Sequence, residues 1–166
     1  QHGAPVNMMT VDLSQLLEQV SASFELEGQK RGIEVSSATQ PTPLLVDADP
    51  EKLGRVFSNL VANALKYGNG ASYIKIDARQ VGASVVIEVA NDGTQIPAAS
   101  LGHLFERFYR VESSRSKDTG GTGLGLAIVK SIVDLHHGEV EVTSTPQVTT
   151  FTVILPLHQT AVAAQV

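Results

Sequence analysis

The sequence predicts an α/β sandwich of the α+β kind, in which a mixed, mostly antiparallel sheet is covered on one face by helices. Residues 13–24 and 50–67 repeat apolar side chains at helical spacing. Residues 73–90 form two β-rich runs on either side of Gly82-Ala83, the pattern of a hairpin. The last third of the chain then reads helix, strand, strand. We expect about five strands and about three helices in this architecture.

The composition fits one domain with a hydrophobic core. The chain has 166 residues, of which 42% are hydrophobic, and a net charge of -5. A negative net charge does not favour binding to nucleic acid. The sequence also contains no long apolar run of the kind that would predict membrane contact. Cysteine is absent, which excludes disulfides, thiolate nucleophiles and cysteine-ligated zinc. We expect a soluble domain over residues 10–157, preceded by a disordered leader or artificial boundary at 1–9 and followed by a tail at 158–166.

The first predicted helix begins after Asp12, a suitable N-cap, and ends near Gly32. Its core-facing positions share a helical spacing: Leu13, Leu16, Leu17, Val20 and Phe24. Short strands are expected at residues 33–35 and 44–46, with a loop containing proline between them.

Asp49-Pro50 predicts the start of a second helix, because aspartate caps helices and proline suits the first helical position. The helix should continue to Tyr67, where Gly68-Asn69-Gly70 stops it. Five residues form its core stripe: Leu53, Val56, Phe57, Leu60 and Ala64.

The remaining elements follow from turn residues and periodicity. The predicted segments are strands 73–81 and 84–90, one or two helical turns within 97–110, a loop at 113–121, a helix at 123–137, and strands 139–143 and 149–155. His136-His137 ends the last helix just before Gly138, and we expect these histidines to favour the helix C-terminus electrostatically.

A glycine-rich stretch runs directly into this last helix. In Thr119–Lys130, three glycines alternate: Gly121, Gly123 and Gly125. Glycines there allow a sharp turn or a close approach to a ligand, and the free N–H groups of a helix start can hold a phosphate. A purely structural turn is the alternative. The stretch does not match a P-loop, which needs Lys-Ser or Lys-Thr where Leu126-Ala127 stand. It does not match a dinucleotide fingerprint either, which needs a glycine at the position of Leu126.

A polar stripe lies on the second helix beside the core stripe. It consists of Asn59, Asn63, Lys66 and Tyr67, spaced so that they share one side. Asparagine disfavours helix interiors, and its carboxamide oxygen suits Mg²⁺, which also binds phosphate oxygens and water. A solvated polar face is the alternative explanation.

Three motifs in order resemble the boxes of sensor histidine kinases. Residues 59–67, Asn-Leu-Val-Ala-Asn-Ala-Leu-Lys-Tyr, resemble the N box; residues 104–110, Leu-Phe-Glu-Arg-Phe-Tyr-Arg, resemble the F box; and residues 121–126 resemble the second glycine box. The resemblance extends from the first helix to Leu155. It implies the catalytic and ATP-binding domain of such a kinase, in the Bergerat-type ATP-binding fold with a flexible lid over the nucleotide.

The resemblance also implies roles for individual residues. Asn63 would coordinate Mg²⁺, Asn59 would support the metal and the phosphates, Lys66 would neutralise phosphate charge, and Tyr67 would pack on the base or ribose. The phosphates would lie at the N-terminal end of the last helix, next to the lid. The implied phosphate contacts there are Gly121, Gly123, Leu124, Gly125 and Leu126.

Two arginines of the F box could also bind phosphate, and Arg110 is the better candidate by family position. Phe105 and Phe108 are expected to pack and to anchor the lid. Lys117 and Thr149 each have two interpretations. Either could contact the nucleotide, or Lys117 is an ordinary surface lysine and Thr149 an ordinary strand threonine.

The adenine corner departs from the family pattern. The first glycine box usually reads Asp-x-Gly-x-Gly, whereas this sequence has Asn91-Asp92-Gly93-Thr94-Gln95 and then Ile96. Strand alternation puts Asn91 on the apolar face of Val89, so we expect Asn91, with Gly93 and Ile96, to contact the base. A neutral acceptor predicts weaker binding than a carboxylate. A bulge that turns Asp92 inward is the alternative.

The implied activity is transfer of the γ-phosphoryl group of ATP to a histidine in a preceding dimerisation domain, with Asn59, Lys66 and Arg110 in catalytic roles. No His-Glu-x-x-Thr-Pro acceptor motif occurs in the chain. The implied cofactors are ATP and Mg²⁺. The implied partners are ATP or ADP, the acceptor domain and a response regulator, in a membrane-tethered homodimer with this domain in the cytoplasm. An anti-sigma-type serine kinase, or a binding module without phosphotransfer, remains the alternative.

Overall fold

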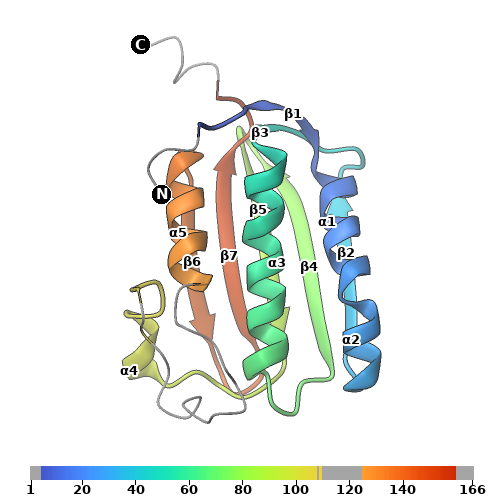
Figure 1. The fold of residues 1–166 in the computed structure, drawn as a ribbon, viewed down its shortest axis with the longest axis vertical. Helices are drawn as coiled ribbons and strands as arrows, with labels where there is room; N and C mark the ends of the chain where they lie inside the picture. Colours follow the sequence, from blue (N-terminus) through green and yellow to red (C-terminus); the bar gives the residue numbers. More distant parts are fainter. Residues whose placement is uncertain (1–4, 108, 110–124, 160–166) are drawn as a thin grey trace.

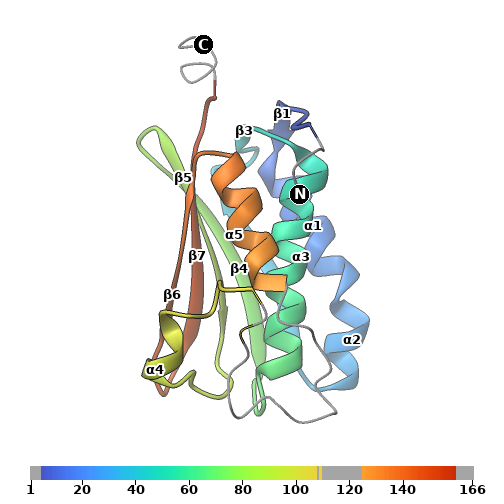
Figure 2. The same ribbon diagram turned by 60° about the vertical axis from the view of Figure 1, so that its left-hand side comes forward.

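The computed structural model describes residues 5–107, 109 and 125–159. A five-stranded sheet with the order β2-β4-β5-β7-β6 forms one layer, and helices α1, α3 and α5 cover one of its faces (Figures 1 and 2). β2 and β4 are parallel, while the other neighbours in this sheet are antiparallel. The predicted α/β sandwich with a mixed sheet is therefore confirmed.

The helices and strands of the described residues have the following bounds: β1 Met9–Asp12, α1 Leu13–Ser23, α2 Glu25–Lys30, β2 Glu34–Gln40, β3 Leu45–Ala48, α3 Pro50–Tyr67, β4 Tyr73–Val81, β5 Ser84–Asn91, α4 Ala98–Leu101, α5 Gly125–Leu135, β6 Glu139–Ser144 and β7 Thr149–Pro156. The hairpin of β4 and β5 and the two final strands lie where the sequence predicts them. The predicted helical turns after residue 97 contain the four-residue α4.

The central helix α3 begins and ends as predicted. The Asp49 carboxylate accepts from the Lys52 backbone N–H at 3.1 Å, and Pro50 occupies the first turn. All five residues of the predicted core stripe are buried. They face the inward side chains of β5, Val85, Ile87 and Val89, which are also buried. This packing fixes the orientation of the polar flank of the same helix.

The N-terminal region differs from the sequence prediction in three respects. The strand expected at residues 33–35 is β2, which continues to Gln40. The single predicted helix breaks at Phe24, and α2 then packs so closely on β2 that a Cβ on Gly28 would lie 2.9 Å from Cγ2 of Val35. Met9–Asp12 forms β1, which pairs antiparallel with β3 in a separate two-stranded sheet. The predicted leader therefore overlaps a strand at Met9. Four residues are too few to show a period, so no sequence pattern predicts this strand.

The expectation for His136 is also corrected. The ring is fully buried, its Nε2 accepts from the Asp49 backbone N–H at 3.0 Å, and its Nδ1 lies 2.9 Å from the Ile132 carbonyl oxygen. An N–H can only donate, so Nε2 carries no proton and Nδ1–H donates to Ile132. His136 is therefore a neutral bridge between α5 and the start of α3, rather than a cation at a helix end.

No helix among residues 5–107, 109 and 125–159 is both long and apolar enough to cross a membrane.

Candidate nucleotide site on α3 and the end of β5

The polar stripe of α3 faces the start of α5. Asn59 donates from Nδ2 to the Gly125 carbonyl oxygen over 3.4 Å, which joins the two helices at this flank. Asn59, Asn63 and Tyr67 are half-buried, whereas Lys66 is exposed at the last turn of the helix. The four predicted residues therefore share one flank, and its chemistry changes along the axis from amides to a cation and an aromatic ring.

The Asn63 side chain makes no hydrogen bond to any other described residue. A half-buried carboxamide without a protein partner can supply its oxygen to a ligand. Within the part of the chain that the structure describes, no group of three or more His, Cys, Asp or Glu could form a cage for a metal. This donor set fits Mg²⁺, which takes one or two protein oxygens and completes its shell with phosphate and water.

The other end of the site lies where α3 stops. Gly68 follows the helix, and its backbone approaches Gly93 so closely that a Cβ on Gly93 would lie 2.7 Å from Gly68 atoms. Asn59 and Gly68 are nine residues apart, which is about 13 Å along a helix. The flank of α3 thus connects the start of α5 with a glycine-lined corner beside β5.

Asn91 and Asp92, the two candidates for the base contact, point to different surroundings. Asn91 is 5% exposed, and its Oδ1 accepts from the Gly93 backbone N–H at 2.8 Å. Asp92 accepts from the Ser72 N–H at 2.7 Å, the Ser72 hydroxyl at 2.5 Å and the Tyr73 N–H at 3.1 Å. Asn91 therefore continues the inward face of β5, as strand alternation predicts, and Asp92 holds the loop before β4.

The ionisation of Asp92 reflects these bonds. Burial opposes the charged form, but hydrogen bonds from the Ser72 hydroxyl and from the backbone of Ser72 and Tyr73 outweigh it, so the pKa of the Asp92 carboxyl is lowered. A carboxylate held in this way has a structural partner already. The alternative in which a bulge turns Asp92 into the pocket has no support in this geometry.

A hydroxyl pair lies beside Asn91 across the sheet. Thr149 is the register partner of Asn91, is buried, and shares a 2.5 Å hydrogen bond with the Ser144 hydroxyl. The Ile96 backbone N–H donates to the same Ser144 oxygen at 2.8 Å. Ser144 is a residue that sequence reasoning missed. It ends an ordinary strand, and its position follows from pairing with β7, which leaves no local signal.

The remaining predicted site residues divide into two groups. Gly125 is exposed at the start of α5, Leu126 is half-buried beside it, and Ile96 packs against the core. Arg110, Gly121, Gly123 and Leu124 lie outside the described residues, as do Phe108 and Lys117. In the F box, Phe105 meets Phe151 edge to face with ring centroids 6.1 Å apart, which fits its predicted packing role.

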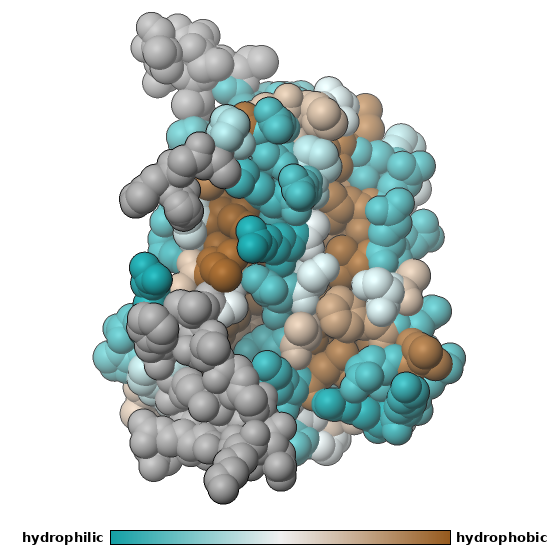
Figure 3. Space-filling view, in the orientation of Figure 1, coloured by the Kyte–Doolittle hydropathy of each residue, from teal (hydrophilic) through white to brown (hydrophobic). Residues whose placement is uncertain are grey.

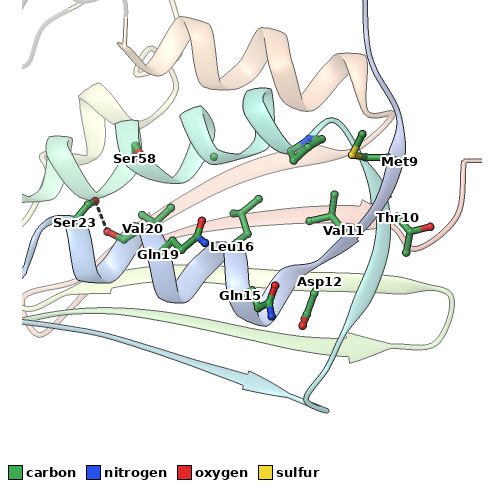
Figure 4. A pocket seen from close by; sticks show the side chains of 12 residues that line it. Met9, Thr10, Val11, Asp12, Gln15, Leu16, Gln19, Val20, Ser23 and Ser58 are labelled. Atoms are coloured by element: carbon green, nitrogen blue, oxygen red, sulfur yellow. Dashed lines mark hydrogen bonds between the residues drawn. The ribbon is translucent and has the colours of Figure 1, made fainter.

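A second hollow lies on the opposite flank of α3. It is an open groove of about 440 Å³ between α1 and α3, bordered by β1. Apolar surface is visible along this seam in Figure 3, and Figure 4 shows the side chains that line the groove. Leu16 and Val20 contribute from α1, and Gly54 and Ser58 contribute from α3. None of the predicted nucleotide contacts lines this groove, so it is separate from the site on the α5 flank.

Carboxamides along the central helix, with a glycine corner at the end of a mixed sheet, are the features expected of a nucleotide-binding domain of the α/β sandwich class. The family model described as histidine kinase-, DNA gyrase B-, and HSP90-like ATPase matches residues 48–159. The chain belongs to this family.

Curated relatives and solved structures agree with this assignment. The chain is 42% identical to the sensor protein VanS of Enterococcus faecium over 146 residues, which cover 88% of this chain and 38% of VanS. The nucleotide-free catalytic domain of the histidine kinase ThkA superposes with a TM-score of 0.80 and 28% identity, covering 92% of this chain and 97% of that one. ThkA has also been solved in complex with the response regulator protein TrrA.

A third similar protein was solved with a nucleotide analogue. Full-length ShkA in complex with AMPPNP has a TM-score of 0.81 and 26% identity, and the match covers 92% of this chain and 32% of ShkA. The chain thus spans about two fifths of VanS and about a third of ShkA, but nearly all of the ThkA catalytic domain.

Proposed function

We propose that this chain is the catalytic and ATP-binding domain of a sensor histidine kinase, occupying residues 10–157. The observation that carries the proposal is the arrangement of α3, whose amide-bearing flank faces the start of α5 at one end and the Gly68–Gly93 corner at the other. An elongated ligand with an anionic end and a flat polar end fits this flank. The family assignment and the relatives named as sensor histidine kinases support the same function.

The residues on this flank have distinct tasks in the proposal. Asn63 supplies an oxygen ligand to Mg²⁺, Asn59 orients the phosphates and Lys66 adds positive charge near them. When bound, Mg²⁺ would neutralise charge on the phosphate oxygens. Tyr67 packs on the base or the ribose, and Asn91, Gly93 and Ile96 form the base corner.

The lid side of the proposed site completes the phosphate contacts. In this proposal the phosphates would contact Gly121, Gly123, Leu124, Gly125 and Leu126, and Arg110 would contribute a second cation.

The proposed reaction transfers the γ-phosphoryl group to a ring nitrogen of a histidine on a dimerisation domain, and ADP leaves. The histidine nitrogen is itself the nucleophile, so the domain contributes positioning and electrostatic stabilisation. Hydrolysis would require a base for water. Asn59 holds the position where hydrolytic relatives carry a glutamate, and an amide cannot accept that proton at neutral pH. Slow ATPase activity is therefore expected.

The proposed setting is a two-component signalling system. The acceptor domain would precede this one in a membrane-tethered homodimer, with the catalytic domain in the cytoplasm, and the phosphoryl group would pass to a response regulator. The response-regulator complex of ThkA and the names of the sensor relatives motivate these partners.

Labelled phosphate provides the test. The chain is mixed with a separately made acceptor hairpin from a sensor histidine kinase, Mg²⁺ and γ-labelled ATP, and acid-labile phosphohistidine is measured. Asn63→Ala should reduce Mg²⁺-dependent ATP affinity by about tenfold or more and abolish transfer. Ser58→Ala, on the groove flank of the same helix, should change neither property.

Each negative result has a defined meaning. ATP binding without phosphohistidine would favour the alternative of a nucleotide-binding module without phosphotransfer, which the departures at Asn91 and Gln95 motivate. Labelled phosphoserine would favour the anti-sigma-type kinase. Absence of Mg²⁺-dependent binding of ATP or ADP in calorimetry would contradict every nucleotide proposal made for this chain.

A further inference from the structure

We propose that the base corner accepts 6-oxopurine nucleotides as well as adenine nucleotides, because Asn91 offers a hydrogen-bond donor in addition to an acceptor. This inference rests on the proposed nucleotide site and adds the class of base that the site takes. It depends on the orientation of one buried amide and on the neighbours of that amide.

The orientation of the Asn91 amide is fixed by its own backbone surroundings. The Gly93 N–H lies 2.8 Å from the amide, and because an N–H donates, the atom that faces it is the oxygen Oδ1. The Nδ2 group therefore points elsewhere. It has no hydrogen-bond partner among the described residues, although the side chain is 5% exposed. A buried donor without a partner is costly, so this group indicates a ligand that brings an acceptor.

The two classes of purine present opposite patterns at the relevant edge. Adenine has an amino donor at position 6 and an acceptor at N1, whereas a 6-oxopurine has an acceptor at position 6 and a donor at N1. Asn91 can serve both. Nδ2 can donate to adenine N1 or to a 6-oxo oxygen, and Oδ1 retains a second lone pair beside the bond from Gly93.

A carboxylate at this position would behave differently. It has acceptors but no donor at neutral pH, so it binds an amino group well and repels a 6-oxo oxygen. The nearest such group along the chain, Asp92, is already held by Ser72 and Tyr73 on the other side of the strand. The corner therefore lacks the repulsive element that would exclude a 6-oxopurine.

The neighbouring hydroxyl pair is equally adaptable. In the 2.5 Å contact between Ser144 and Thr149, either oxygen can be the donor. When Ser144 donates, the Thr149 hydroxyl hydrogen is released for a ligand acceptor. When Thr149 donates, its oxygen keeps a lone pair for a ligand donor. Because Thr149 pairs with Asn91 across the sheet, a hydroxyl that can either donate or accept lies beside an amide of fixed orientation that carries both a donor and an acceptor.

Calorimetry with ATP and inosine triphosphate, each with Mg²⁺, tests the inference, since the two nucleotides differ only at the purine 6-position and N1. For the wild-type chain we expect the two dissociation constants to agree within about tenfold. The Asn91→Asp variant should keep or improve its ATP affinity and lose about tenfold or more of its affinity for inosine triphosphate. Uridine triphosphate serves as the control for binding through the phosphates alone.

The wild-type comparison needs no variant, so the test survives if Asn91→Asp fails to fold. Tight ATP binding with inosine triphosphate no better than uridine triphosphate would overturn the inference and leave the proposed kinase domain intact. An equal change in both purine affinities on Asn91→Asp would also overturn it. Absence of binding by every nucleotide would remove the proposed site itself, and the inference with it.

Discussion

Adjacent residues at the end of β5 have separate roles because a strand sends alternate side chains to opposite faces. Asn91 is buried on the helix side, and Asp92 binds the loop before β4 through three hydrogen bonds. The departure from the usual glycine box therefore changes the chemistry of the proposed base contact. It is not a one-residue shift of the aspartate into the pocket.

At this residue scale, Asn91→Ala should mainly lower ATP affinity, whereas Asp92→Ala should mainly lower the stability of the fold. Asn91→Ala removes the proposed base contact, so ATP affinity should fall by about tenfold. Asp92→Ala leaves three donors without their acceptor, so the free energy of unfolding should fall by about 1–3 kcal/mol while the ATP affinity of the folded protein stays within about twofold. Calorimetry and urea denaturation of both variants measure these effects. Equal losses of ATP affinity would contradict the assignment.

At the scale of elements, the two glycines at the ends of α5 differ in their surroundings. Packing requires a small residue after the C-terminal end of the helix but not at its first residue. A Cβ on Gly138, just after the helix, would come too close to the Ile154 carbonyl oxygen, whereas no atom of the described residues lies within 4 Å of a Cβ on Gly125. Packing against the described residues therefore does not require glycine at position 125, and the proposed approach of the phosphates is the reason that remains to be tested. Gly54, inside α3, has the same open surroundings.

Substitution at these two open glycines separates ligand contact from packing. Gly125→Val should abolish ATP binding, because its side chain would occupy the space of the phosphates, while the circular dichroism spectrum stays unchanged. Gly54→Ala should leave ATP affinity unchanged and raise the free energy of unfolding by about 0.5–1 kcal/mol, because alanine favours a helix interior. Normal ATP affinity in Gly125→Val would make the glycine stretch a structural turn.

The C-terminal end of α5 gives a second prediction at this scale. His137 has φ of 59°, the left-handed conformation that favours glycine. His137→Gly should raise the free energy of unfolding by about 0.5–1 kcal/mol, because relief of about 1–2 kcal/mol of strain exceeds the added entropy of the unfolded chain. Gly138→Ala should lower it by about 1–3 kcal/mol through overpacking. Thermal and urea denaturation measure both, and a stabilising Gly138→Ala would contradict the close approach.

At the scale of the whole molecule, Asp49 links three distant segments. Its carboxylate accepts from the Asn7 N–H at 2.9 Å and caps α3, and its own N–H donates to His136 at the end of α5. Gln159 extends the connection, since its side chain donates to the His136 carbonyl oxygen at 2.9 Å. The end of the sandwich opposite the base corner is therefore held by one continuous set of hydrogen bonds.

This set predicts how stability depends on pH. Burial opposes the charge of Asp49, but the bonds from Asn7 and Lys52 and the positive charge of Lys52 outweigh it and lower the pKa of the carboxyl. A lowered folded-state pKa means that the stabilisation is complete above about pH 4 and is lost as pH falls through the folded-state pKa. The pKa values of Asp12 and Asp92 are lowered too, so their contributions have the same sign.

Urea denaturation between about pH 6 and pH 3 measures this dependence. The wild-type chain should lose free energy of unfolding toward low pH, and Asp49→Asn should lose less, because an amide does not titrate. Asp134→Asn, which removes an exposed carboxylate paired with Lys130, is the matched control for the change in charge. Identical pH slopes for the wild type and Asp49→Asn would contradict the proposed role of the capping carboxylate.

The sequence by itself determined the sandwich, the bounds of α3 and the hairpin, and the two flanks of α3. Those features depend on local periods of 2 and 3.6 residues and on caps such as Asp49-Pro50, which act within one element. The same alternation put Asn91 rather than Asp92 on the inward face.

Only the tertiary structure decided what those side chains meet. The contact of Gly68 with Gly93, the buried bridge through His136, and the hydroxyl pair of Ser144 and Thr149 all join segments far apart in the chain or in different strands. β1 likewise exists because β3 lies beside it. Such contacts arise from packing between elements, and no local pattern encodes them. The buried nitrogen of Asn91, which has no hydrogen-bond partner among the described residues, became visible for the same reason, once Gly93 fixed the direction of its amide.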